Sequence, residues 1–253
     1  MGARSVTDAQ LAARLAGEAG ALLLSRRAQL LAEGRSGKEL GDAGDQAANA
    51  YLCEAIARLR PDDGLLSEEE KDDPARLGKS RVWIVDPVDG TREYGEERAD
   101  WAVHVGLAVD GVATAGAVAL PGLDGGVVFR SDERVPLPPA HDGAPRLLVS
   151  RTRPAPQAVA VAQMLGGELV PMGSAGAKAM AVVRGEADIY LHTGGQYEWD
   201  SCAPVAVARA QGLHCSRIDG SPLIYNRADT YMPDLLICRP EWTDKVIEAV
   251  ACA

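Results

Sequence analysis

Two carboxylates stand directly after an apolar run of strand length. The run is Arg81-Val-Trp-Ile-Val85, and Asp86-Pro-Val-Asp89 follows it without a break. Burying unpaired carboxylates costs several kcal/mol each, so a cation is the expected partner. Ligation by oxygen alone, with no His or Cys nearby in the sequence, favours a hard ion such as Mg²⁺. Asp86, Asp89 and the carbonyl of Val88 could therefore hold Mg²⁺.

Gly90 and Thr91 complete this motif. Their backbone N–H groups could bind a phosphate oxygen, with the Thr91 hydroxyl beside it. The motif would then suit metal-dependent chemistry on a phosphate ester. An ordinary type I turn is the alternative, because Asp-Pro and Asp-Gly are common turn dipeptides.

Glu68 is a further candidate ligand, from the acidic run Ser67-Glu-Glu-Glu70. Acidic runs are usually solvated surface. However, the short apolar pair Leu65-Leu66 could lie beside the strand 82–85, which would place Glu68 next to Asp86. The other two glutamates of the run are expected to be solvated.

Asp200 and Ser174 stand at the expected starts of two helices. Glu198-Trp-Asp200-Ser precedes an apolar helix, so Asp200 could be a helix N-cap or a metal ligand held at the helix start. Gly173-Ser174-x-x-x-Lys178 places a hydroxyl, N–H groups and an ammonium around a helix N-terminus, which suits an anion. A capped helix with an exposed lysine fits Gly173–Lys178 equally well.

The elements that must position these residues can be derived from the apolar spacing. Thr7-x-x-Gln10 is a capping-box pattern, and it starts a helix that ends near Gly34. A polar loop over 35–44 leads into a second helix, which Pro61 stops. Asp110-Gly111, between two apolar runs, predicts a hairpin.

The second half of the chain alternates between strands and helices, which predicts a layered α/β unit. Strands are expected at 147–150, 187–192 and 235–238, and helices at 155–165, 174–183, 201–211 and 244–251. The proline-rich segment Pro136–Pro145 separates the halves. We therefore expect an N-terminal α+β subdomain over 1–140 with most metal ligands, and a C-terminal α/β subdomain over 141–253 with Asp200 and the substrate-binding residues.

Composition excludes several classes of protein. The net charge of −10 argues against a nucleic acid polymer or an anionic membrane as the partner. The five cysteines are scattered and form no C-x-x-C pair, so neither a zinc site nor a disulfide framework is expected. The apolar run 19–24 is too short for a membrane span. We expect a soluble cytoplasmic protein.

Taken in order, these motifs resemble those of the inositol monophosphatase-like superfamily of metal-dependent phosphatases. The matching elements are Ser67-Glu-Glu69, Trp83–Thr91, Gly173-Ser174 and Trp199–Pro204. Within the superfamily the chain is most similar to the 3′(2′),5′-bisphosphate nucleotidases of sulfate assimilation, of the actinobacterial type. Glu93 is one reason, since inositol phosphatases usually carry Asn there.

The resemblance implies a five-layered αβαβα sandwich and two to three Mg²⁺ ions. The implied ligands are Glu68, Asp86 and the Val88 carbonyl for the first ion, Asp86, Asp89 and Asp200 for the second, and Glu68 for a looser third. Water activated by the metal would attack the phosphate, with Thr91 and an upstream Asp removing its proton. The resemblance also implies inhibition by Li⁺.

One family motif has no clean match in this chain. The usual Pro-Val-Thr-x-Ala-Asp stretch is replaced by Leu40-Gly-Asp-Ala-Gly-Asp45. We align Asp45 as the partner of Thr91, with Asp42 as the alternative. Tyr94 in place of the commoner Phe is a further departure, and it bears on the substrate more than on the chemistry.

The expected function is hydrolysis of the 3′-phosphate of adenosine 3′,5′-bisphosphate to AMP and phosphate. Four residues are expected to meet the nucleotide, especially its 5′-phosphate: Arg151, Thr152, Ser174 and Lys178. Residues of the metal site complete the substrate-contacting set: Glu68, Val88, Asp89, Gly90, Thr91 and Asp200.

An inositol-1-phosphate or fructose-1,6-bisphosphate phosphatase with the same metal site is the first alternative. A non-catalytic divalent-metal or nucleotide-binding protein is a more remote one. The expected partner is a small phosphorylated metabolite, and a homodimer is compatible with the sequence.

Overall fold

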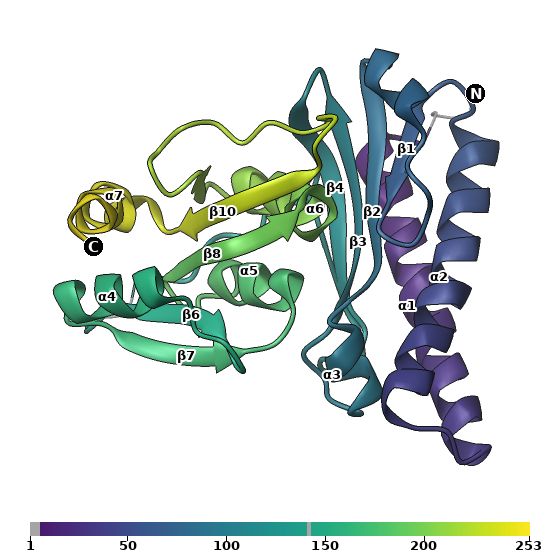
Figure 1. The fold of residues 1–253 in the computed structure, drawn as a ribbon, viewed down its shortest axis with the longest axis horizontal. Helices are drawn as coiled ribbons and strands as arrows, with labels where there is room; N and C mark the ends of the chain where they lie inside the picture. The colour runs from purple at the N-terminus through teal and green to yellow at the C-terminus, as the bar shows by residue number, and fades with distance from the viewer. Residues whose placement is uncertain (1–5, 141–142) are drawn as a thin grey trace.

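The computed structural model describes residues 6–140 and 143–253. Over these residues the chain forms two five-stranded sheets, ordered β1-β2-β3-β4-β5 and β7-β6-β8-β10-β9. Five layers follow one another (Figure 1): helices α1 and α2, the first sheet, helices α5 and α6, the second sheet, and helices α4 and α7. This order confirms the αβαβα fold class.

The strands divide between the sheets at the middle of the chain. The first sheet contains β1 (Gly64–Ser67), β2 (Arg81–Asp89), β3 (Ala102–Val109), β4 (Val112–Leu120) and β5 (Val127–Arg130). The second contains β6 (Arg146–Ser150), β7 (Glu168–Met172), β8 (Ile189–Tyr197), β9 (His214–Ser216) and β10 (Tyr231–Cys238). The helices are α1 (Asp8–Ala32), α2 (Gly37–Leu59), α3 (Thr91–Gly95), α4 (Pro156–Leu165), α5 (Ala175–Val183), α6 (Glu198–Ala210) and α7 (Thr243–Cys252), with short 3₁₀ turns at Pro74–Gly78 and Pro240–Trp242.

The predicted loop over 35–44 is wrong, because α2 already begins at Gly37. Two glycines that weaken the helical signal of this segment are needed for packing. A Cβ on Gly41 would lie 2.7 Å from the side chain of Thr91, and a Cβ on Gly44 would lie 2.7 Å from the ring of Tyr94. Close approach of α2 to α3 therefore outweighs the low helix propensity of glycine.

Two predicted pairings in the first sheet are confirmed. Strand β1 runs parallel to β2, with Leu66 opposite Ile84 and Ser67 opposite Val85. Strands β3 and β4 form the predicted hairpin, and Asp110 and its neighbouring glycine both have positive φ. A hairpin turn with two positive φ angles matches the right-handed twist of its strands.

The second sheet contains more strand than the sequence predicts. Strand β7 was not expected, and it carries Pro171, which suits its place at the sheet edge. Strand β9 is another unexpected edge strand. Strand β8 continues through Gly194 and Gly195, which interrupt the apolar pattern, and ends where α6 begins.

Helices from the second half of the chain pack against the first sheet. One apolar cluster joins Ile84 of β2 and Val118 of β4 to Met180 of α5, Val205 of α6 and Leu235 of β10. This core holds the end of β2 against the starts of α5 and α6. The division into subdomains at residue 140 stays a prediction.

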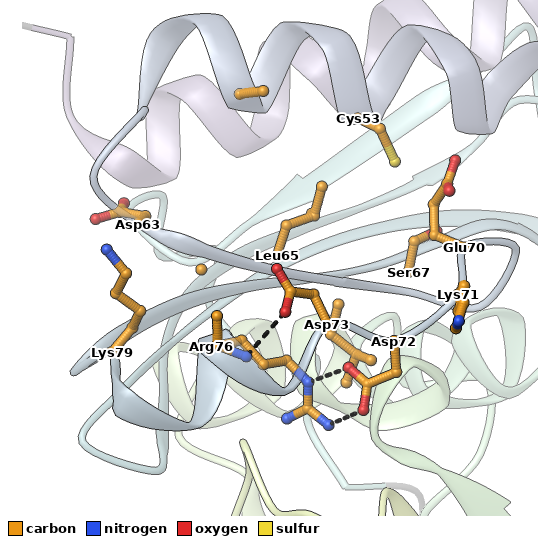
Figure 2. A pocket seen from close by; sticks show the side chains of 14 residues that line it. Cys53, Asp63, Leu65, Ser67, Glu70, Lys71, Asp72, Asp73, Arg76 and Lys79 are labelled. Atoms are coloured by element: carbon orange, nitrogen blue, oxygen red, sulfur yellow. Dashed lines mark hydrogen bonds and ion pairs between the residues drawn. The ribbon is translucent and has the colours of Figure 1, made fainter.

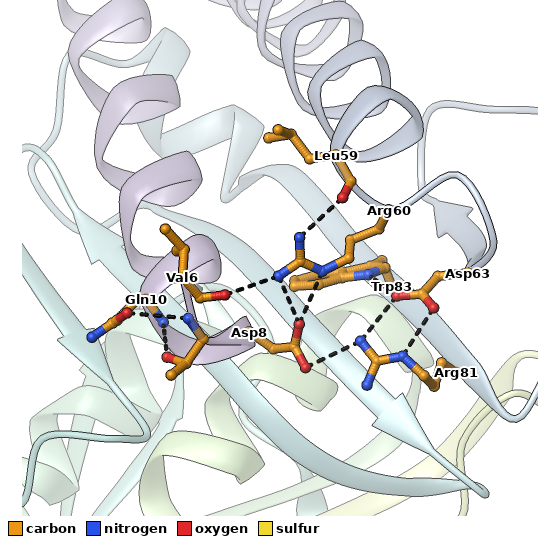
Figure 3. A network of polar contacts seen from close by, with 9 residues as sticks. Val6, Asp8, Gln10, Leu59, Arg60, Asp63, Arg81 and Trp83 are labelled. Atoms are coloured by element: carbon orange, nitrogen blue, oxygen red, sulfur yellow. Dashed lines mark hydrogen bonds and ion pairs between the residues drawn. The ribbon is translucent and has the colours of Figure 1, made fainter. Parts of the chain in front are cut away.

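Charged side chains fix the opposite end of β2, far along the strand from Asp86 (Figure 3). Asp8 in the first turn of α1 accepts hydrogen bonds from Arg60 and Arg81. Asp63 accepts two from Arg81, and a third from the indole of Trp83 at 2.8 Å. Within the described ranges, 6–140 and 143–253, no helix combines the length and apolarity needed to cross a membrane.

Candidate active site

Three carboxylates meet where the first sheet faces the middle helices. Oxygens of Asp86, Asp89 and Asp200 lie within 4.8 Å of one another. Asp86 and Asp89 come from the end of β2, and Asp200 from the first turn of α6. Three negative charges this close repel one another strongly unless protons or cations neutralise them.

Asp86 is the most deeply buried of the three, with 1% of its surface exposed. Its Oδ1 atom has no hydrogen-bond partner in the part of the chain that the structure describes. Burial raises the pKa of Asp86 well above its ordinary value, and the charges of Glu68, Asp89 and Asp200 raise it further. An orphaned carboxylate oxygen among other oxygen donors fits a hard divalent cation.

Asp200 is held in place by the chain just before it. The backbone N–H of Tyr197 donates to Asp200 Oδ2 at 2.6 Å. Burial raises the pKa of Asp200 to about 6, and the charge of Asp89 adds to this effect. The predicted N-cap role of Asp200 is wrong, because α6 begins at Glu198 and its N-cap is Tyr197. Asp200 closes a capping box from the first turn of α6, and it is also a member of the carboxylate cluster.

Asp89 differs from its two neighbours because donors surround it. The Ser174 hydroxyl donates to Asp89 Oδ2 at 2.5 Å, and the backbone N–H groups of Ala175 and Gly176 donate at 3.0 and 2.6 Å. His104 Nε2 lies 3.2 Å from the same carboxylate. Burial opposes the ionisation of Asp89, but the His104 charge and these hydrogen bonds lower the pKa of Asp89 below its ordinary value.

The N-terminus of α5 therefore binds an anion that belongs to the chain itself. The sequence left an external anion and an ordinary capped helix equally open there, and in the structure Asp89 accepts from the first N–H groups of the helix. Lys178 also differs from the expected exposed lysine, since only 6% of its surface is exposed. Its ammonium donates to the carbonyl of Ser174 at 2.6 Å and lies over the ring of Tyr190. Lys178 thus stabilises the turn that presents Ser174.

Glu68 reaches the cluster through the parallel pairing of β1 and β2. Its backbone N–H donates to the Val85 carbonyl at 3.3 Å, which extends the pairing by one residue. Glu68 as a whole is exposed, but partial desolvation of its carboxyl group raises its pKa to about 7, and the charge of Asp200 acts in the same direction. The predicted neighbourhood of Glu68 and Asp86 is thus present.

Thr91 stands at the start of α3, just after the cluster. Gly90, with φ of 93°, turns the chain out of β2. The Thr91 hydroxyl donates to the Val88 carbonyl at 3.1 Å. The backbone of Gly90 is in the left-handed region, which glycine adopts without steric strain, and this explains why the motif contains glycine.

Asp45 lies beside Thr91, on the face of α2 that packs against α3. Burial raises the pKa of Asp45 to about 8, and the charge of Glu69 contributes. Asp45 Oδ1 has no hydrogen-bond partner within the described residues, because the Thr91 hydroxyl donates to the Val88 carbonyl. Asp42 instead is solvent-facing and forms an ion pair with Lys38 at 2.6 Å. The structure therefore places Asp45, and not Asp42, in contact with Thr91.

Arg151 lies at the rim of the site and is engaged by two carboxylates. One of its terminal nitrogens lies 3.0 Å from Glu93 and 2.9 Å from Glu96. Its Nε has no hydrogen-bond partner within the described residues. Thr152 follows in an exposed loop. Glu93 and Glu96 thus orient Arg151.

Sequence reasoning missed two features of the site. No sequence motif indicated His104, which is fully buried against Asp89. The alternation of β3 could have indicated that His104 faces the middle helices. The second feature is an aromatic stack beside Asp200. Tyr197 stacks on Trp199 with ring centroids 4.8 Å apart, and Tyr231 meets Tyr197 edge-on at 6.0 Å. Tyr231 is far from this motif in sequence, so no local signal could have found it.

Comparisons with known proteins agree with this geometry. Residues 4–253 match the inositol monophosphatase family. The chain is 49% identical over 249 residues to the 3′-phosphoadenosine 5′-phosphate phosphatase of Mycobacterium leprae, covering 93% of this chain and 90% of the relative. It is 27% identical to the 3′(2′),5′-bisphosphate nucleotidase CysQ of Escherichia coli, covering 75% of this chain and 81% of the relative.

Solved structures show the same fold. The crystal structure of CysQ from Bacteroides thetaiotaomicron superposes with a TM-score of 0.74 at 27% identity, covering 93% of this chain and 98% of that chain. The inositol monophosphatase of Anabaena superposes with a TM-score of 0.73 at 22% identity, covering 96% and 94%. The carboxylate cluster, the five-layered fold and these matches lead to one conclusion: the chain belongs to the inositol monophosphatase family.

Proposed function

We propose that this chain hydrolyses the 3′-phosphate of adenosine 3′,5′-bisphosphate and releases AMP and phosphate. The observation that carries the proposal is the buried cluster of Asp86, Asp89 and Asp200 beside the Thr91–Asp45 pair. The 49% identical relative, which is named for this nucleotide, supports the choice of substrate.

The donor set of the site fits Mg²⁺, with two to three ions as the family resemblance suggests. Glu68, Asp86 and the Val88 carbonyl would hold one ion, and Asp86, Asp89 and Asp200 a second. Glu68 would also contact a third. When bound, Mg²⁺ lowers the pKa of water and neutralises charge on the phosphate oxygens. The orphaned Oδ1 of Asp86 supports this assignment.

Thr91 and Asp45 form the proton-handling pair. Asp45 is buried, which raises its pKa in the metal-free protein, and a bound cation nearby would favour its ionised, proton-accepting form. A group of this kind can accept a proton from attacking water through the Thr91 hydroxyl. The backbone N–H groups of Gly90 and Thr91 lie where the chain turns out of β2, and we assign them to the phosphate oxygens.

One feature favours a nucleotide over an inositol or sugar phosphate. Tyr197 and Tyr231 are 45% and 41% exposed, and Tyr197 stacks on Trp199, the residue next to Asp200. Aromatic surface at a phosphate site suits a flat base, because stacking stabilises a bound base by roughly 1–3 kcal/mol. Inositol and sugar phosphates carry no aromatic ring.

Arg151, with Thr152 beside it, is our candidate for the 5′-phosphate. Both glutamates contact the same terminal nitrogen of Arg151, so neither contact uses the other terminal nitrogen of the guanidinium. Guanidinium groups bind phosphate through two parallel hydrogen bonds, which makes arginine suitable for a second, non-reacting phosphate.

The test is to incubate the purified chain with adenosine 3′,5′-bisphosphate and Mg²⁺ and to separate the products. AMP and phosphate in equal amounts are expected. Adenosine 3′-phosphate as the product would reject the proposed regiochemistry. Tyr197→Leu should raise KM for the nucleotide by about tenfold and leave the turnover of inositol 1-phosphate unchanged. Tyr197→Phe keeps an aromatic ring, so both quantities should stay at their wild-type values. Equal effects on the two substrates would remove the aromatic argument.

A further inference from the structure

Asn49 of α2 binds both ends of the turn that carries Glu68. The Ser67 hydroxyl donates to Asn49 Oδ1 at 2.7 Å, and Asn49 Nδ2 donates to Glu70 Oε1 at 2.8 Å. We call Ser67–Glu70 the acidic turn. A single buried amide thus joins α2 to the residues on either side of Glu68.

The amide of Asn49 makes three of the four hydrogen bonds that it can make. The thiol of Cys53, one helical turn further along α2, also donates to Asn49 Oδ1, at 3.2 Å. Two donors on the oxygen and one acceptor on the nitrogen fix which way the amide faces. Asn49 is 7% exposed, so losing these partners would leave a buried polar group unpaired.

The acidic turn borders open space over its last three residues, which are exposed. Behind the turn lies a cavity of about 500 Å³ whose lining includes Cys53, Ser67 and Glu70. Figure 2 shows the Cys53 side chain extending from the helix toward Glu70 across this space. The backbone of the turn adds two long hydrogen bonds, from the Glu68 N–H to the Val85 carbonyl at 3.3 Å and from the Glu70 N–H to the Ser67 carbonyl at 3.4 Å. A turn that borders open space depends on its polar contacts for a fixed position.

The same helix carries Asp45, one turn before Asn49. Residues four apart lie on the same helix face, so Asn49 and Asp45 both face β1, β2 and α3. The contact from Asn49 to the acidic turn therefore relates the position of Glu68 to that of Asp45 and Thr91. It acts on Glu68 through Ser67 and Glu70, without touching the carboxylate cluster.

We propose that Asn49 is a positioning residue that holds Glu68 in place for a divalent cation. Removing its contact with Glu70 frees the distal end of the acidic turn and weakens cation binding. The cation site is part of the proposed function, so the inference rests on it. The effect lies in Mg²⁺ affinity and not in the chemical step once Mg²⁺ is saturating.

The experiment is a calorimetric titration of the metal-free protein with MgCl₂, with no nucleotide present. Glu70→Ala removes the acceptor for Asn49, whereas Glu70→Gln removes the same charge but keeps an acceptor oxygen. Glu54→Ala is the matched control, since Glu54 is an exposed glutamate on α2. Glu70→Ala should weaken Mg²⁺ binding by about tenfold, the equivalent of one hydrogen bond, and Glu70→Gln by less than about threefold. Glu54→Ala should bind like the wild type.

Asn49→Asp gives a second, independent test. Its carboxylate still accepts from Ser67 but repels Glu70, so Mg²⁺ binding should weaken at least as much as in Glu70→Ala. With Mg²⁺ saturating, the kcat of all these variants should stay within about threefold of wild type. Equal losses in Glu70→Ala and Glu70→Gln would mean that Glu70 acts through its charge, and wild-type affinity in Glu70→Ala would mean that the contact positions nothing. Either result overturns the inference.

These outcomes are separate from the fate of the proposed function. If the wild type binds Mg²⁺ but does not hydrolyse adenosine 3′,5′-bisphosphate, the substrate is wrong and the positioning role is still tested by the titrations. If hydrolysis is confirmed and Glu70→Ala binds Mg²⁺ normally, only the role of Asn49 fails.

Discussion

The Ser174 hydroxyl donates to Asp89 across the boundary between the two halves of the chain, at 2.5 Å. Two backbone N–H groups of α5 and His104 also lie against Asp89, so its carboxylate is surrounded by hydrogen-bond donors. Asp86 and Asp200, its neighbours, have raised pKa values because burial and mutual repulsion favour their protonated forms. The cluster thus contains one carboxylate whose pKa its donors lower and two whose pKa values burial and repulsion raise.

Asp89→Asn should abolish activity and also destabilise the fold. An amide cannot accept all the hydrogen bonds from Ser174, Ala175 and Gly176, and its NH₂ group would face some of these donors. We expect the free energy of unfolding to fall by about 1–3 kcal/mol and kcat to fall at least about a hundredfold. Thermal unfolding in chelator and a phosphate-release assay measure the two effects. Unchanged stability would mean that Asp89 does not cap α5.

Asp86→Asn should have the opposite effect on stability. Asp86 is buried without a partner for Oδ1, so replacing it removes an unfavourable group from the metal-free protein. The melting temperature in chelator should hold or rise, and the increase that Mg²⁺ causes in the wild type should disappear. A variant whose melting temperature is lower in chelator and still rises when Mg²⁺ is added would contradict the ligand role of Asp86.

The stability of the metal-free protein should fall as pH rises. Glu68, Asp200 and Asp45 have pKa values of about 7, 6 and 8, all above their ordinary values. The folded state therefore holds protons that the unfolded chain has already released, and this stabilisation is lost between about pH 5 and about pH 8. Mg²⁺ replaces these protons, so its stabilising effect should grow over the same range. Melting curves with Mg²⁺ and with chelator, taken across this range, test both trends, and parallel curves would count against proton–metal exchange.

Arg151→Met and Lys178→Met should differ, although both remove a cation. Arg151 lies at the rim, so its loss should lower kcat/KM for adenosine 3′,5′-bisphosphate by about one to two decades and change inositol 1-phosphate turnover little. Lys178 is buried and holds the turn at Ser174, so its replacement should affect both substrates and the melting temperature. A nucleotide-specific loss in Lys178→Met would restore the substrate role that the sequence predicted for it.

The sequence located the carboxylate cluster because strong local patterns surround each member. An apolar strand before Asp86 and an apolar helix after Asp200 each fix where a side chain stands, and the family motifs join them. The pairing of β1 with β2 was predictable for the same reason. Such patterns reflect the periodicity of apolar residues, which can be recognised in a single sequence.

The sequence could not locate what depends on close approach between distant segments. Gly41 and Gly44 weaken the helix prediction locally, but the side chains of α3 require them. An external anion at the N-terminus of α5 was one of two interpretations of the sequence, because no local pattern indicates that Asp89 of β2 accepts hydrogen bonds there. The direction of Lys178 and the Asn49 contacts likewise follow from tertiary packing, which overrides local preference.

The most direct test of the proposed function is kcat/KM for adenosine 3′,5′-bisphosphate against inositol 1-phosphate, both with saturating Mg²⁺. The nucleotide should be preferred by at least about a hundredfold, which corresponds to about 2.7 kcal/mol of transition-state stabilisation. This preference would come from the rim arginine and the aromatic stack beside Asp200. Equal values for the two substrates, or phosphate release from the nucleotide that persists in excess chelator, would contradict the account.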